Sequence, residues 1–283
     1  MKIRKPAVAG QFYPNDFEIL KSKIKFFIKS KNKISDDKKI RAIIVPHAGY
    51  DYSGETAGKV FALLKNFSYE KIVILAPSHT TPFYGIAATE YSHYETPLGN
   101  LEVDLTVLDS LVNSKGDFIK TINKAHTFEH SLEVELPFIQ YLFPNTSIVP
   151  LICGHIESYS ETAHILNTLW NPETLWVISS DFTHYGRVFD YIPFSENINN
   201  ELKKLDYEAL DIIKSKNFQG FQEYLERTGA TICGAEPIKL LLKIIQQHSD
   251  NENLQAEIIH YTNSAELTGD FSYSVSYAGI VFK

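Results

Sequence analysis

The sequence at residues 42–50 reads AIIVPHAGY and decides the fold. Its first four residues are apolar and mostly β-branched, which predicts a short strand buried on both faces. His47 follows this strand almost at once. The same order recurs twice, because an apolar strand at 72–76 leads to His79, and another at 175–178 leads to His184 through the stretch SSDFTHYG. Three predicted strands therefore deliver an imidazole at their carboxyl ends.

Apolar strands alternate with amphipathic helices along the rest of the chain. Further strands are expected at residues 84–89, 148–152, 258–262 and 274–282. Helices are expected at residues 54–64, 103–112, 131–143, 161–170, 196–214, 218–227 and 237–247. No internal repeat or long linker interrupts this alternation.

The alternation predicts an α/β fold in a single domain that spans residues 1–283. We expect a largely parallel or mixed central sheet with helices on both faces. The strands at 42–45 and 72–76 fit one right-handed βαβ crossover. The last two strands fit an antiparallel hairpin.

Composition narrows the classes of function. The 283 residues carry 27 Lys and Arg against 34 Asp and Glu, a net charge of −7, and only four are arginines, so nucleic acid is not an expected partner. No apolar stretch approaches the roughly 20 residues that span a bilayer, and residues 1–6 lack the apolar core of a signal peptide. We therefore expect no membrane partner and a cytoplasmic location. Two cysteines favour reduced thiols.

The three histidines that follow strands indicate a metal site. In an open α/β sheet the ligand crevice lies at the carboxyl ends of the strands, where His47, His79 and His184 are expected. Neutral imidazoles are common ligands of iron, copper and zinc, and suit magnesium or calcium less well. The alternative for each histidine alone is a hydrogen-bonded loop residue.

A second cluster, HTFEHSLE at residues 126–133, formally matches the H-x-x-E-H pattern of inverted zinc proteases. On a continuous helix, His126 and His130 would share one face and Glu129 would act as the general base. Pro137 limits such a helix. A surface loop is the alternative, and a third option is that His130 and Glu133 line the same crevice as His47.

Cys233 lies just ahead of the apolar helix expected at 237–247. A helix start can stabilise a thiolate through unpaired N–H groups and the helix dipole, although a free cysteine is more often a small buried apolar residue. Glu236, three positions later, could supply a carboxylate beside or instead of the thiolate. Its alternative role is a first-turn charge that matches the dipole.

Taken together, these motifs resemble those of the MEMO family. The resemblance begins with PAVAGQFYP at residues 6–14 and runs in order through nearly the whole chain. Its further motifs are PHAGY at 46–50 with SG at 53–54, PSH at 77–79, EHS at 129–131, SSDF at 179–182 with His184 and Gly186, and ICG at 232–234.

The resemblance implies a fold similar to class III extradiol dioxygenases, which are non-haem iron enzymes that cleave catechol-type rings. It places His47, His79 and Cys233 at the family's metal-ligand positions. Asp181 and His184 correspond to polar residues near the site, where His130 also matches a motif histidine. We therefore expect His184, with Asp181 and His130, to serve as catalytic residues if a reaction occurs.

The dioxygenases bind iron through two histidines and a carboxylate, whereas Cys233 replaces the carboxylate here. A thiolate favours copper(I) and zinc, although such a site also holds iron(II). We expect an iron(II)-dependent redox protein or oxidoreductase, with copper or zinc as alternative metals. The competing interpretations are a non-catalytic metal- or peptide-binding protein and a zinc hydrolase. The expected partners are a small molecule or peptide in the crevice and, from the prokaryotic relatives, a radical-SAM protein.

Overall fold

The computed structural model describes residues 1–29, 38–248 and 253–283. The centre of its main sheet consists of parallel strands with almost wholly buried side chains, as expected for apolar runs covered on both faces. In spatial order these strands are β2 (Ala42–Val45), β9 (Thr174–Ser179), β3 (Lys71–Pro77) and β8 (Ser147–Cys153).

Strands of mixed direction extend the sheet at both sides. β12 (Tyr273–Phe282) runs antiparallel to β2, and both β10 (His184–Gly186) and β11 (Ala256–Asn263) pair with it antiparallel. At the other side β4 (Ile86–Ala88) runs antiparallel to β8 and parallel to β7 (Ile119–Thr121). The prediction of an α/β fold with a mixed central sheet is confirmed, while the likeness to dioxygenases stays a prediction.

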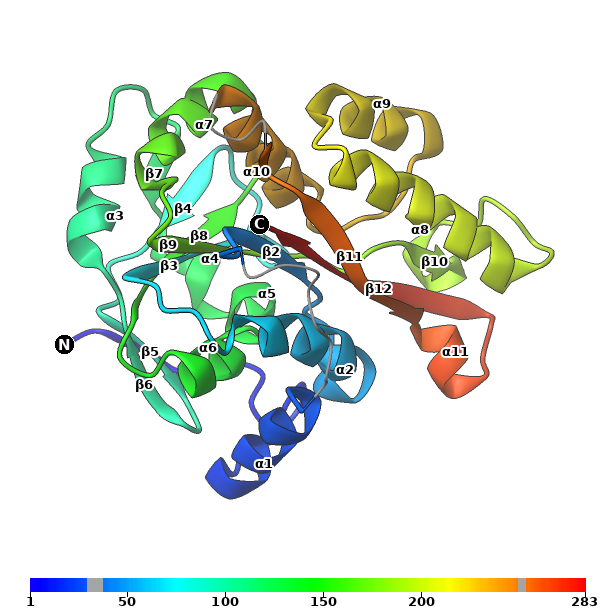
Figure 1. Cartoon of the computed structure of the whole chain (residues 1–283), viewed down its shortest axis with the longest axis horizontal. Coiled ribbons are helices and arrows are strands. Elements are labelled where there is room, and N and C mark those ends of the chain that lie inside the picture. The colour runs from blue at the N-terminus through cyan, green and yellow to red at the C-terminus, as the bar shows by residue number, and fades with distance from the viewer. Residues whose placement is uncertain (30–37, 249–252) are drawn as a thin grey trace.

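Helices cover both faces of the sheet (Figure 1). One face carries α7 (Tyr159–Leu166) and α10 (Ala235–Gln247), and α10 packs on β3 and β9. The other face carries α2 (Tyr50–Phe61), α5 (His130–Glu133) and α6 (Leu136–Leu142), with α1 (Phe17–Phe27) packed outside them. Among the described residues, the remaining α-helices are α3 (Leu105–Val112), α4 (Asn123–Thr127), α8 (Ile198–Lys214), α9 (Phe218–Thr228) and α11 (Ser264–Thr268).

The strand order differs in detail from the expected crossover. β2 and β3 are parallel, but β9 lies between them, so they are not neighbours. The last two long strands do form the expected antiparallel pair, although α11 joins them instead of a tight turn. Inserting β9 between β2 and β3 brings the residues that follow all three strands to one edge of the sheet.

The helix predicted over residues 131–143 is divided in two. α5 ends at Glu133, and Pro137 stands in the first turn of α6. Proline suits this position because its missing N–H would have no partner there. His130 is thereby placed at the start of a short separate helix, next to β3.

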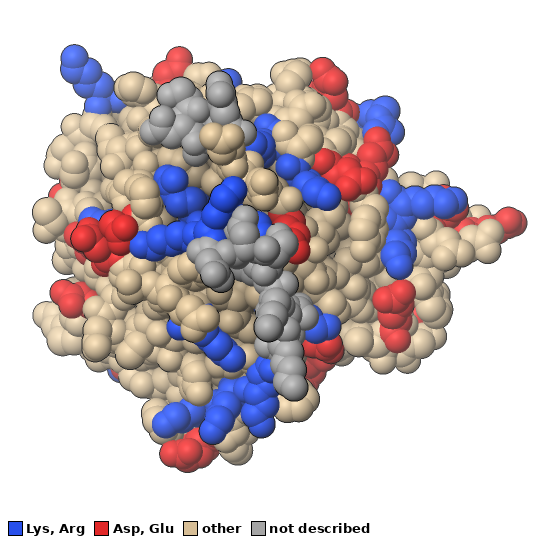
Figure 2. Space-filling view, viewed as in Figure 1, with Lys and Arg blue, Asp and Glu red and all other residues tan. Residues whose placement is uncertain are grey.

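A small second sheet lies beside the main one and includes the N-terminus. It consists of β1 (Ile3–Arg4), β5 (His93–Thr96) and β6 (Gly99–Glu102). On the face shown in Figure 2, acidic and basic side chains are interspersed, with some basic side chains gathered at the end where α1 lies. Among the described residues, each helix is too short or too polar to cross a bilayer.

Candidate metal centre

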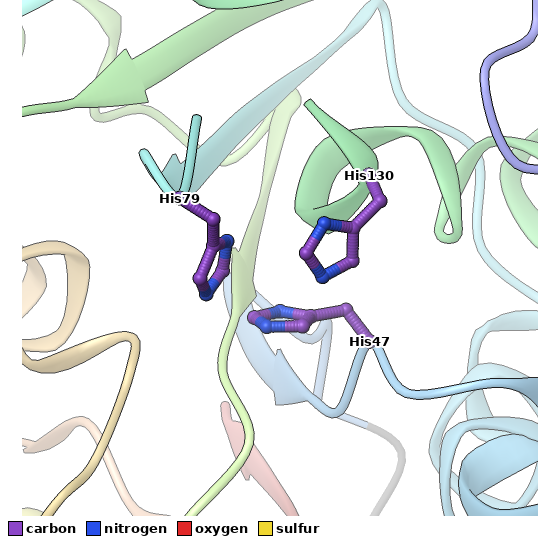
Figure 3. A group of neighbouring side chains, drawn as sticks. All are labelled: His47, His79 and His130. Atoms are coloured by element: carbon purple, nitrogen blue, oxygen red, sulfur yellow. The ribbon is translucent and has the colours of Figure 1, made fainter. Parts of the chain in front are cut away.

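Three imidazoles converge at the carboxyl edge of the central strands (Figure 3). His47 follows β2, His79 follows β3, and His130 begins α5. One nitrogen from each ring lies within 4.8 Å of the others. Two ligands that each lie about 2.0 to 2.3 Å from one ion are at most roughly 4.6 Å apart. Small side-chain shifts therefore suffice for all three to reach a common ion.

His47 is buried, and its ring orientation is set by Ser179 at the end of β9. The Ser179 hydroxyl donates to the carbonyl of Ser131 at 2.6 Å, so its oxygen is left to accept from Nδ1–H of His47 at 2.7 Å. Nε2 then carries the lone pair. Burial, and next the repulsion from His79 and His130 when these are protonated, holds the pKa of His47 well below its usual value. His47 is thus a neutral imidazole suited to bind a cation.

His79 is oriented by the carboxylate of Glu129. Its Nδ1 lies 2.9 Å from Oε1 of Glu129, and its backbone N–H donates to Oε2 at 2.6 Å. Burial opposes ionisation of Glu129, but the hydrogen bonds from the ring and the backbone of His79 help to outweigh it, and the pKa of Glu129 is lowered to about 2. A carboxylate that accepts from Nδ1–H leaves the Nε2 lone pair of His79 available.

His130 completes the group of three imidazoles. Its ring centroid lies 4.6 Å from that of His79 and 5.5 Å from that of His47. Phe12 packs edge-on against its outer side with centroids 5.1 Å apart. Burial and the neighbouring charge of His79 lower the pKa of His130 to about 4, so this ring is also neutral near pH 7.

Cys233 lies beside His47 rather than within the group of three. Its sulfur is 3.2 Å from Nε2 of His47 and accepts a hydrogen bond from the backbone N–H of Asp181 at 3.2 Å. Burial raises the pKa of this thiol well above its usual value. At the start of α10, desolvation of the thiol thus opposes the effect of the nearby N–H groups.

Asp181 and His184 lie on the segment that leaves β9. The Asp181 carboxylate accepts from the backbone N–H of His47 at 2.9 Å, and burial raises the pKa of Asp181 to about 6. Nδ1 of His184 lies 2.9 Å from the carbonyls of Phe182 and Thr231, so Nδ1 carries the proton. The other nitrogen of His184, Nε2, is therefore its proton-accepting atom.

Other sequence candidates lie outside the group. His126 is buried, with Nδ1 against the Tyr94 hydroxyl at 2.7 Å and Nε2 against the carbonyl of Ala87 at 3.0 Å, so both nitrogens are occupied. Because α4 ends at Thr127 and α5 begins at His130, His126 and His130 do not share a helix face, contrary to the condition of the protease interpretation.

Glu133 and Glu236 also have other partners. Glu133 is fully buried against the guanidinium of Arg4, so only His130 of that pair reaches the crevice. Glu236 accepts from Lys239 at 2.7 Å and from the hydroxyl of Tyr159. Its place beside Lys239 fits the structural role of a paired charge at the start of α10.

Two polar residues beside His47, Ser179 and Glu135, were not predicted from the sequence. Ser179 orients the ring, and its hydroxyl also lies 3.2 Å from Oε1 of the buried Glu135. Burial raises the pKa of Glu135 well above its usual value, and its Oε2 atom has no hydrogen-bond partner among the described residues. The position of Ser179 directly after a buried strand, at the same edge as His47, was the signal available in the sequence.

A cavity of about 520 Å³ adjoins the centre. The residues that line it include Cys233 and Glu236 and the aromatic residues Phe83, Tyr84 and His155. This volume lies in the range typical of small-molecule pockets. A ligand held there would lie next to Cys233.

Comparison with known proteins gives matches over nearly the whole chain. The family model described as Memo-like protein matches residues 4–281. The "Protein memo-1 homolog" of Caenorhabditis elegans is 34% identical over 254 residues, which cover 86% of this chain and 72% of the relative. A "MEMO1 family protein" of Thermococcus onnurineus is 33% identical over 295 residues, with 99% of both chains covered. Another from Methanosarcina mazei is 31% identical over 288 residues, again with 99% of both covered.

Proposed function

Because this chain belongs to the Memo family, we propose that it is a metal-binding protein whose centre holds iron(II) and serves a redox reaction. His47, His79 and Cys233 are the proposed ligands. The observation that carries the proposal is the convergence of three imidazole nitrogens within 4.8 Å, with the sulfur of Cys233 3.2 Å from one of them.

The donor set fits a transition metal. His47 and His79 each use Nδ1–H for a hydrogen bond to the protein, to Ser179 and Glu129 respectively, which leaves Nε2 free to bind. Metal-binding histidines are commonly oriented in this way. Imidazole and thiolate suit iron, copper and zinc, whereas magnesium and calcium prefer oxygen ligands.

Bound iron(II) would supply a redox couple and open coordination positions for ligands. Around it, His184 is the proposed acid/base residue, because its Nδ1–H is held by two carbonyls and its Nε2 can accept a proton. Asp181 accepts from the backbone N–H of His47, and its buried carboxyl interacts electrostatically with His184. The adjoining cavity is the proposed binding place of a small molecule or the side chain of a peptide.

His130 competes with Cys233 for the third ligand position. Geometry favours His130, since its nitrogen belongs to the group of three and the sulfur of Cys233 does not. The family resemblance favours Cys233. We retain Cys233 as the proposed third ligand and His130 as the acid/base residue nearest His79.

Metal analysis of untagged protein purified without oxygen tests the proposal. We expect near-stoichiometric iron in the wild type, loss of iron in Cys233→Ala, and retained iron in Glu236→Ala, the matched control from the same helix start. Loss of iron in His130→Ala with retention in Cys233→Ala would assign the third position to His130. A wild type without iron, copper or zinc would refute the metal centre.

Nitric oxide tests the redox part of the proposal. It binds iron(II) only where a coordination position is open, so the anaerobic iron-loaded protein should form a coloured nitrosyl complex. Failure to form it would contradict an open coordination position on the proposed iron. For the zinc-hydrolase alternative, metal content should be unchanged in His126→Ala, because both nitrogens of His126 are already hydrogen-bonded.

A further inference from the structure

The carboxylate of Glu129 accepts hydrogen bonds from four N–H groups. Oε1 accepts from the ring Nδ1 of His79 at 2.9 Å and from the backbone of Ser131 at 3.1 Å. Oε2 accepts from the backbone of His79 at 2.6 Å and from that of Thr80 at 3.3 Å. Glu129 is 1% exposed, so water does not substitute for these donors.

Only an ionised carboxylate can satisfy this arrangement. It offers two acceptor oxygens and no donor, whereas a glutamine side chain would turn its NH₂ group toward two N–H donors. The carboxylate therefore requires a proton on Nδ1 of His79, which in the neutral ring places the lone pair on Nε2. Without the Glu129 carboxylate, both tautomers of a neutral imidazole are accessible to His79.

Arg4 holds the loop that carries Glu129. This arginine is 1% exposed and donates from Nη2 to the carbonyl of Glu129 at 2.7 Å and from Nε to the carbonyl of His126 at 3.0 Å. Its Nη1 pairs with the carboxylate of Glu133. A single guanidinium thus fixes the backbone on both sides of the break between α4 and α5.

The residues after Arg4 continue this support. The backbone N–H groups of Ala7 and Val8 and the hydroxyl of Tyr13 donate to Glu133 at 2.8, 3.0 and 2.6 Å. Phe12 packs on the ring of His130, and its carbonyl accepts from the N–H of Tyr50 at 2.7 Å, just after His47. The segment 4–13 therefore contacts the loops of two clustered histidines.

We propose that Glu129 is the positioning residue that presents Nε2 of His79 to the metal centre, and that Arg4 holds Glu129 in place for this task. The metal part of this inference rests on the proposed function, whereas the tautomer of His79 does not. Oε1 of Glu129 also lies 3.4 Å from Nδ1 of His130, so Glu129 acts on the metal centre through the imidazoles and is not itself a proposed ligand.

Nitrogen-15 NMR of histidine-labelled, metal-free protein tests the inference directly. The resonances of His79 are identified by their absence in His79→Gln. We expect His79 to be the Nδ1–H tautomer in the wild type and to shift toward the Nε2–H form in Glu129→Gln. Tyr69→Phe is the control, because it removes a buried tyrosine hydrogen bond to the carbonyl of Ile40, outside the group.

Metal binding provides the second readout. With cobalt(II) as the probe, we expect Glu129→Gln to bind roughly 10- to 100-fold more weakly than wild type and with an altered visible spectrum. Arg4→Lys keeps a charge opposite Glu133, but a lysine cannot reach the carbonyls of both His126 and Glu129. We therefore expect a several-fold loss of cobalt(II) affinity and a partial shift of the His79 tautomer. Circular dichroism before each titration establishes that both variants are folded.

The outcomes separate the two proposals. A wild type that binds no metal refutes the proposed function, yet the NMR measurement still decides the role of Glu129. An unchanged His79 tautomer in Glu129→Gln overturns the inference even if metal binds. A shift in Glu129→Gln with none in Arg4→Lys overturns the role of Arg4.

Discussion

The sulfur of Cys233 lies 3.2 Å from Nε2 of His47, although the two residues are 186 positions apart in the chain. His47 follows β2, and Cys233 precedes α10, which packs across β3 and β9. Since β9 lies beside β2, this helix brings Cys233 over the end of the strand that carries His47. A sulfur and an imidazole nitrogen at this distance can share one ion.

Removing the hydroxyl that orients His47 should weaken metal binding. Ser179→Ala leaves Nδ1–H of His47 without its acceptor, so we expect a roughly 10- to 100-fold loss of affinity in a competition titration with a chelator. Ser274→Ala is a suitable control, because Ser274 is buried but bonds Asn263 and Ala265 instead of a clustered histidine. Equal affinities for the two variants would contradict this role.

Loss of the Arg4 charge should destabilise the fold. Arg4→Met leaves the carboxylate of Glu133 buried without its cation, which costs about 3–5 kcal/mol. The matched control is Lys2→Met, since the Lys2–Glu90 pair is 50% and 63% exposed and such pairs contribute less than about 1 kcal/mol. Urea denaturation measures both free energies of unfolding. Similar values for the two variants would contradict the prediction.

Acid should destabilise the protein partly through His126. Burial is the main cause that lowers the pKa of His126 from 6.5 to about 4. As the pH falls, His126 is therefore protonated in the unfolded chain before it is protonated in the folded protein. Neutral His126 therefore contributes about 3 kcal/mol to the free energy of unfolding above pH 6.5. This contribution is lost as the pH falls from 6.5 through about 4.

The variant His126→Gln isolates this contribution. Its free energy of unfolding should fall less steeply than that of wild type between neutral pH and about pH 4, because glutamine does not titrate. The comparison requires urea titrations of both proteins at several pH values. Parallel pH profiles would show that His126 does not have the lowered pKa.

A methyl group at Gly234 should disturb Cys233. A Cβ atom at Gly234 would lie 2.2 Å from Cβ of Ser180, so the backbone next to Cys233 must move. We expect Gly234→Ala to cost about 1–3 kcal/mol of stability and to weaken metal binding. At Gly49, near His47, the added Cβ would lie 3.5 Å from the carbonyl oxygen of Phe12, an ordinary contact. Gly49→Ala should therefore bind metal as wild type does, and equal losses would refute the steric argument.

Local sequence patterns predicted the elements near the site well. The strands that precede His47 and His79 lie where their apolar runs indicated, because continuous burial on both faces requires continuous apolar sequence. α1 and the small second sheet were not predicted. The sheet's strands are only two to four residues long, and so short a pattern carries little periodicity.

The sequence by itself determined which side chains follow the buried strands, and it indicated a histidine-rich crevice at their carboxyl ends. Tertiary structure decided which of them meet. It brought His130 to His47 and His79, placed Cys233 beside His47, and enclosed His126 away from them. The physical reason is that strand order and helix breaks depend on packing between distant segments. In this chain the insertion of β9 between β2 and β3, and the contacts of Arg4 with the carbonyls of His126 and Glu129, set those positions.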